Sequence, residues 1–156
     1  MTSTIISIIE SLDVEQALNS WECVPIAELE KPILRHAYDK NDIRAYTLTT
    51  QLLLHQHRWE WHYLASLILS QSLCHMPGAY FSAFHHAVEA CKLAPDDQSL
   101  KEYLLFFYIV SDQPMSDEHA SEVANKLILA DPTNTVAIET IAKLKKRQSL
   151  KNNSGS

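Results

Sequence analysis

Glycine is almost absent from this chain, which has only Gly78 and Gly155 among its 156 residues. Glycine readily adopts the positive backbone dihedral angles that tight hairpin turns and phosphate-binding loops require. A fold with many tight turns between strands therefore lacks its turn residues, and the glycine-rich loops of nucleotide-binding folds are excluded. Helices remain as the main building element, because Pro, Asp, Asn and Ser are enough to begin and end them.

Apolar residues recur at helical spacing along the whole chain, and no stretch shows the sustained alternation of a half-buried strand. Residues that stop or cap helices, such as Pro95, Ser116 and Pro132, separate the periodic segments. The pattern predicts helices over residues 3–19 with a break near Asp13, and over 25–39, 42–56, 58–73, 79–94, 98–110, 116–130 and 134–147. Since the connections are short, we predict an all-α fold of antiparallel helical hairpins.

Small residues recur along one face of the expected helix 79–94 and are followed by a proline. The positions concerned are Tyr80, Ala83, Ala87, Ala90 and Pro95, preceded in the helix before by Trp61, Leu64, Ala65 and Ile68. This pattern resembles the tetratricopeptide repeat (TPR), in which small residues let paired helices approach closely and a proline ends the unit. A second, more degenerate copy contains Tyr103, Phe106, Phe107 and Val110, and then Ala120, Ala124 and Pro132.

The resemblance implies a short stack of helical hairpins with a capping helix at its end. The expected organisation is a single α-helical domain over residues 1–150 and a disordered tail over 149–156. Within the domain, residues 1–57 form N-terminal helices, 58–132 two degenerate TPR-like repeats, and 133–148 the cap. Because two repeats bury little apolar surface by themselves, the N-terminal helices must pack on them.

Charge is distributed unevenly along the chain. The formal net charge is −6, with −10 in residues 1–132 and +4 in residues 133–156. An acidic body repels nucleic acid and anionic membranes and favours a basic protein partner. We interpret the C-terminal Lys and Arg residues as complements to the dipole of the last helix.

Two sets of residues are candidate partner-binding sites. The first is an acidic edge near the turns of the second half, comprising Asp96, Asp97, Asp112, Asp117, Glu118 and Glu122. The second is the concave groove that the TPR resemblance implies, lined by Trp59, His62, Ser66, Lys101, Leu104, Tyr108 and Glu139, of which Trp59, His62, Lys101 and Tyr108 are the main candidates. An exposed Trp59 could anchor a partner, although burial beneath the N-terminal helices is equally consistent with its position.

Signatures of chemistry are missing. The histidines, including His62, His85 and His86, do not follow a zinc-ligand spacing such as HExxH, so we predict no metal and no cofactor. The serines lie in helical sequence without a G-x-S-x-G turn, which argues against a catalytic nucleophile. Three separated cysteines, no basic N-terminal signal region and no long apolar run favour a cytoplasmic protein.

These observations predict a non-catalytic protein-interaction module. Small acidic helical proteins of this size resemble bacterial immunity proteins, so the most specific hypothesis is an immunity protein that neutralises a basic, nuclease-like toxin. The alternative is an adaptor or chaperone that holds an extended peptide in a concave groove. The hypothesis of a metal-dependent enzyme is supported only by the histidines. The hypothesis of self-association through an exposed helical face does not explain the acidic net charge.

Overall fold

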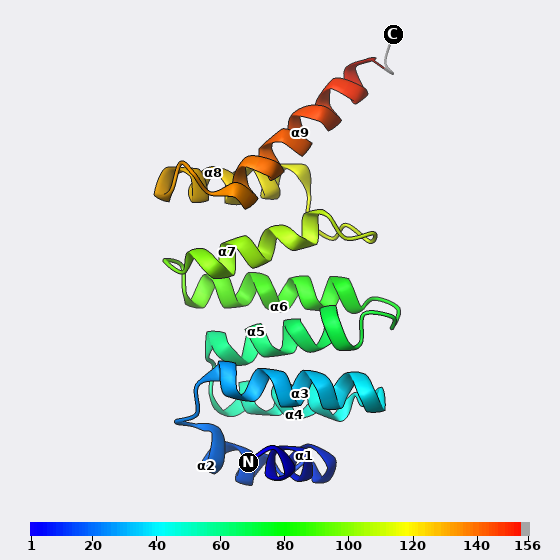
Figure 1. Cartoon of the computed structure of the whole chain (residues 1–156), viewed down its shortest axis with the longest axis vertical. Helices are drawn as coiled ribbons and strands as arrows, with labels where there is room; N and C mark the ends of the chain where they lie inside the picture. The colour runs from blue at the N-terminus through cyan, green and yellow to red at the C-terminus, as the bar shows by residue number, and fades with distance from the viewer. Residues whose placement is uncertain (154–156) are drawn as a thin grey trace. The chain divides into compact units, whose positions relative to one another are not determined.

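The computed structural model describes residues 1–153, and all regular structure in this range is helical (Figure 1). Each helix expected from the periodicity is present, so the all-α prediction is confirmed. The elements are α1 (Thr2–Ser11), α2 (Val14–Trp21), α3 (Ile26–Lys40), α4 (Arg44–His55), α5 (Trp59–Leu67), the π-helical η1 (Ile68–Ser72), α6 (Ala79–Leu93), α7 (Gln98–Leu105), the 3-10 helical η2 (Phe106–Tyr108), α8 (Asp117–Ala130) and α9 (Thr135–Asn153). None of these helices is both long enough and apolar enough to span a bilayer.

The chain divides into two compact units, Met1–Ala94 and Pro95–Ser156. The first unit contains α1 to α6 and the second contains α7 to α9. Their boundary lies at Pro95, the residue expected to close the first repeat-like segment. A single domain over residues 1–150 stays a prediction, and the two units are described separately.

The N-terminal helices and α5 share the core of the first unit. Ile8 and Ile9 of α1 belong to the same buried cluster as Leu64 and Trp61 of α5. Trp61 is only 2% exposed and is the largest of the fully buried side chains. Because α3 and α4 pack against α5, and residues of α1 and α2 join the same buried cluster, apolar surface that a short repeat array would expose is removed from water.

Helices α5 and α6 pack against each other through small residues. Ala83, Ala87 and Ala90 of α6 are all buried, as expected for a close-contact stripe. Across this contact, the Ser66 hydroxyl donates a hydrogen bond of 2.7 Å to the Ala83 carbonyl. The end of α5 continues into η1, in which the Leu73 amide donates to the Ile68 carbonyl at 2.9 Å.

A buried carboxylate connects α1, α3 and α4. The Asp42 side chain, 8% exposed, accepts from Arg44 Nη2 at 2.8 Å and lies 3.0 Å from His36 Nε2. Arg44 Nη1 in turn donates to the Glu10 carbonyl at 2.7 Å. Hydrogen bonding from Arg44, reinforced by His36, lowers the pKa of Asp42 to about 2.

We expect this carboxylate to stabilise the first unit by about 2 kcal/mol, and to do so only while it is ionised. Because its pKa is lowered in the folded state, the contribution is complete above the pKa of the unfolded chain, about 4, and disappears as the pH falls to about 2. Urea unfolding across this pH range can be followed by NMR signals of the first unit. The free energy of unfolding should depend less on pH for Asp42→Asn than for wild type. Asp39→Asn, which alters a carboxylate that is 53% exposed, is the matched control; an equal slope for wild type and Asp42→Asn would contradict the assignment.

In the second unit, α8 packs along α9, and α7 contacts both. Side chains cap these helices as the sequence predicts: the Ser116 hydroxyl accepts from the His119 amide, and the Asn134 side chain accepts from the Ala137 amide. The buried residues on the facing sides of these helices include Leu104, Ala120, Ala124, Leu127 and Leu144.

Helix α9 extends well past its expected end at residue 147 and continues to Asn153. Residues 149–153, expected to belong to a disordered tail, are therefore helical, while residues 154–156 lie outside the described range. Two causes are visible. The residues just before the segment, Lys145 to Gln148, are good helix formers that carry the helix into it, and Lys151 Nζ binds the Asp117 carboxylate of α8 at 2.9 Å.

Candidate functional site

Two buried histidines of the first unit face each other. His62 on α5 and His86 on α6 are each 7% exposed, and their Nδ1 atoms lie 3.0 Å apart. The Tyr46 hydroxyl lies 3.0 Å from His86 Nε2. Burial lowers the pKa of His86 to about 4 and also lowers that of His62. Both rings are therefore neutral near pH 7, and one ring nitrogen donates its proton to the other ring.

The side chains around the histidine pair bear on whether it could hold a metal ion. Within residues 1–153, no group of three or more His, Cys, Asp or Glu side chains is placed to hold a metal ion. His62 Nε2 is buried and has no hydrogen-bond partner in the described part of the chain. The pair lies between the packed helices α5 and α6, and we expect its protonation to lower the stability of the first unit.

The residues expected to line a concave groove lie mostly in helix contacts. In the first unit, Trp59 is half-buried against Tyr63, with ring centroids 6.3 Å apart, and His62 is buried. In the second unit, Leu104 and Tyr108 are buried and Lys101 Nζ donates to the Pro95 carbonyl. The other positions expected to line the groove are Ser66, which is buried, and Glu139, which is exposed. The structure therefore places most of the side chains that the repeat pattern predicted to line a groove inside their units.

Four of the acidic-edge residues have partners inside the second unit, and for Asp112 the partner is the Ser111 hydroxyl, which donates to it at 3.3 Å. Asp97 caps α7 by accepting from the Leu100 amide at 3.1 Å. Glu122 pairs with Lys126 at 2.6 Å. Asp117 lies 2.9 Å from Lys151 and 3.4 Å from Arg147. Asp96, Asp112 and Glu118 are exposed and form no ion pair with another residue of the described range.

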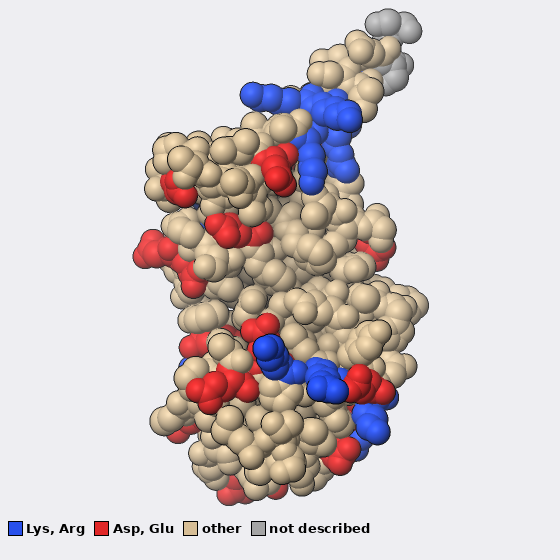
Figure 2. Space-filling view, viewed as in Figure 1, with Lys and Arg blue, Asp and Glu red and all other residues tan. Residues whose placement is uncertain are grey.

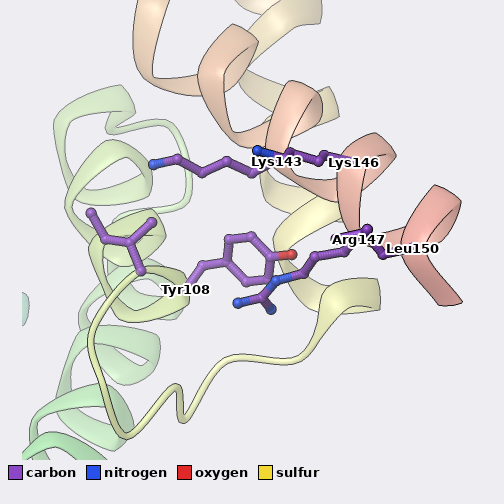
Figure 3. A pocket seen from close by; sticks show the side chains of 6 residues that line it. Tyr108, Lys143, Lys146, Arg147 and Leu150 are labelled. Atoms are coloured by element: carbon purple, nitrogen blue, oxygen red, sulfur yellow. The ribbon is translucent and has the colours of Figure 1, made fainter.

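A basic pocket lies in the second unit, between η2 and α9 (Figure 3). Its volume is about 310 Å³, and its lining consists of Tyr108, Ile109, Lys143, Lys146, Arg147 and Leu150. The four residues from α9 are Lys143 and the residues three, four and seven positions after it, a spacing that puts them on one face of the helix. Figure 3 shows the side chains of Lys143 and Arg147 extending from α9 across the pocket, with the Tyr108 ring between them.

The cations of the basic pocket differ in what they already bind. The Arg147 guanidinium lies 4.7 Å from the centroid of the Tyr108 ring and pairs with Asp117. The Tyr108 hydroxyl donates to the same carboxylate at 3.0 Å, and burial raises its pKa. By contrast, Lys143 and Lys146 form no ion pair within residues 1–153.

Sequence reasoning did not find this pocket, because it interpreted the C-terminal cations as dipole complements. The helix dipole acts within the last turn, and Lys151 is the basic residue there. Lys143, Lys146 and Arg147 lie further from the end of α9. Figure 2 shows Lys and Arg side chains gathered over this helix. A helix prediction extended past residue 147 would have placed three of these side chains and Leu150 on one face.

We expect the Asp117 ion pairs to hold the last turns of α9 against the second unit. In Asp117→Asn, the amides of residues 148–153 should exchange with solvent about 3 to 10 times faster, because exposed ion pairs contribute modestly. Hydrogen exchange followed by NMR measures this directly. Asp112→Asn removes an exposed carboxylate without an ion pair and serves as the control; unchanged exchange in both variants would show that the pairs do not hold the helix end.

No known protein family matches the chain, and no curated protein or solved structure is significantly similar to it. Function must therefore be argued from the residues themselves.

Proposed function

We propose that this chain is a non-catalytic protein-protein interaction module and that it holds a partner at the basic pocket of the second unit. One observation carries the proposal: Lys143 and Lys146 lack an ion-pair partner within residues 1–153 and lie beside exposed apolar side chains at an open pocket. Ile109 is 55% exposed and Leu150 is 59% exposed. An apolar centre with a charged rim is the usual composition of a protein-binding surface.

The lining of the pocket supports binding over catalysis. Among the described residues, its lining includes no histidine, thiol or carboxylate side chain, which are the groups that most often act as general bases near neutral pH. Its one phenol, Tyr108, donates its proton to Asp117 and has a raised pKa, which makes it a poor nucleophile at neutral pH.

We further propose that the two units use TPR-like hairpins as their scaffold. The packing of α5 with α6 and of α7 with α8, together with the buried alanines of α6, supports this assignment. An adaptor or chaperone that holds a segment of another protein fits the basic pocket better than the covering of a basic toxin, because the lysines of the pocket would repel a basic partner.

The immunity function is the second candidate, because a different surface favours it. The carboxylates of Asp96, Asp112 and Glu118 are exposed and form no ion pair within residues 1–153, and residues 1–132 have a net charge of −10. Electrostatic steering by such a surface would speed the capture of a basic toxin. The two candidates therefore predict binding at different places on the second unit.

Affinity capture from the native cell extract, using matched charge variants, separates these candidates. We expect wild type and Lys145→Glu to capture the same partner protein. Lys146→Glu should no longer capture it. Lys145 is also exposed, so both variants change the net charge equally, but Lys145 does not line the pocket. If only the double variant with Asp112→Lys and Glu118→Lys failed to capture the partner, the immunity function would be favoured. If no variant and no wild-type preparation captured a protein, the interaction proposal would be wrong.

A further inference from the structure

We infer that the occupant of the basic pocket is a short acidic, amphipathic segment of another protein, with an apolar side chain in the pocket and carboxylates on Lys143 and Lys146. This inference rests on the proposed function, because it specifies the chemistry of the partner. It concerns a surface of the second unit alone.

The inference that an apolar side chain of the partner enters the pocket follows from the exposed apolar side chains of the lining and from the pocket volume. Ile109 from the segment after η2 and Leu150 from α9 both line the pocket, although each remains more than half exposed. A volume of about 310 Å³ accommodates a large aliphatic or aromatic side chain. Lys143 and Leu150 are seven positions apart on α9, a separation of about 10 Å, which two turns of a bound helix or a few extended residues can span.

The inference that the partner is acidic follows from which charged side chains around the pocket already have an ion-pair partner. Arg147 and Lys151 already bind Asp117, so this carboxylate has little capacity to recognise a basic residue of a partner. Lys143 and Lys146 can each donate up to three hydrogen bonds and have no acidic partner among the described residues. Partner carboxylates would supply charge-assisted hydrogen bonds at these positions.

The limited extent of the positive charge favours a short segment over a long polyanion. Residues 95–156 contain nine Asp and Glu against seven Lys and Arg, so the second unit has a formal net charge of −2. A nucleic acid or an anionic membrane would reach past the pocket to exposed carboxylates such as Glu118. Arg147 covers the Tyr108 ring at 4.7 Å, so this ring is also not free to stack on a base.

Titration of the full chain with defined probes tests the inference. The main probe is a labelled peptide of about 12 residues with Glu and Leu on one helical face, and the matched probe has Lys in place of every Glu. Fluorescence anisotropy gives the affinities, and ¹⁵N NMR shifts locate the contact. Vesicles of phosphatidylcholine, with and without phosphatidylserine, report on membranes.

We expect the acidic peptide to bind, the lysine peptide not to bind, and the shifts to centre on the residues that line the pocket. Lys146→Glu should weaken binding about 10-fold or more, whereas Lys145→Glu should change it less than about 3-fold. Leu150→Ser should also weaken binding, with Leu129→Ser as its control because Leu129 is 85% exposed and lies outside the pocket. All four positions are exposed, so circular dichroism should show unchanged folds.

Several results would overturn the inference. The lysine peptide could bind as tightly as the acidic peptide, or Lys145→Glu could weaken binding as much as Lys146→Glu. The NMR shifts could centre away from the pocket, or neither peptide could bind. Vesicle binding that depends on Lys146 without peptide binding would assign the pocket to a membrane, and concentration-dependent dimers that Lys146→Glu abolishes would assign it to a second copy of the chain. A captured partner that Lys146→Glu retains would overturn the inference while leaving the interaction function intact; failure of all capture would instead overturn the function.

Discussion

Replacing Trp61 with alanine is expected to lower the free energy of unfolding of the first unit by about 3–5 kcal/mol. Trp61 is 2% exposed, and its neighbours in the buried cluster come from the N-terminal helices as well as from α5. Removal of the indole would leave a cavity that the surrounding helices can fill only in part. The Arg58 guanidinium, 5.6 Å from the Trp61 ring, would also lose its aromatic contact.

Urea unfolding followed by NMR signals from α1 and α5 measures this effect for the first unit separately. Trp59→Ala is the matched control, because Trp59 lies two positions away but is only half-buried. We expect the loss for Trp59→Ala to be clearly smaller. Equal losses for the two variants would show that the N-terminal helices do not depend on the Trp61 contact.

Acidification from about pH 6.5 to pH 4 is expected to destabilise the first unit by about 3 kcal/mol, mainly through His86. Its folded-state pKa is lowered to about 4, whereas an unfolded histidine titrates near its ordinary value of 6.5. Between these values the unfolded chain binds a proton that the folded unit does not. Unfolding is therefore favoured as the pH falls through this window, and stability is regained as the pH rises.

The groups around His86 account for the direction of its shift. Burial is the largest cause, followed by the nearby rings of His62 and His85, while Glu89 acts in the opposite direction. His86 also faces Tyr46 from α4, whose pKa burial raises. Two neutral rings can share the Nδ1 contact of 3.0 Å, but two protonated rings cannot.

A non-titrating variant tests this assignment. The free energy of unfolding of His86→Gln should depend much less on pH between about 6.5 and 4 than that of wild type. His75→Gln replaces an exposed histidine of the same unit and should retain the wild-type slope. An unchanged slope in His86→Gln would assign the acid sensitivity to other groups. The Asp42 contribution is distinguishable because it disappears at lower pH, between about 4 and 2.

Local sequence signals located the helices well because helix formation and capping involve residues close in the chain. Asp13 is a clear example: its side chain accepts from the Gln16 amide and separates α1 from α2, near the expected break. The stripe of alanines in α6 was likewise readable, because residues three or four positions apart share a helix face. The same reasoning misjudged the end of α9, where a contact with Asp117 supports the helix.

The candidate sites were much less predictable, because each depends on which side chains meet across elements. Asp117 looked like one member of an acidic edge, yet Lys151 and Arg147 neutralise it from a helix that begins 18 positions later. His62 looked like a groove residue, yet it faces His86 in the interior. These pairings join residues more than 20 positions apart, so local periodicity contains no information about them.

The amino-acid sequence by itself determined the helical class, nearly all helix boundaries and the excess of acidic charge, since these follow from backbone propensities, caps and composition. Only the tertiary structure decided which cations stay unpaired and which aromatic rings are buried. The physical reason is that a charge or an apolar side chain becomes available to a partner only if the fold leaves it unsatisfied. Within residues 1–153 of the second unit, Lys143 and Lys146 have no ion-pair partner and lie beside the exposed side chains of Ile109 and Leu150, where we propose the binding site.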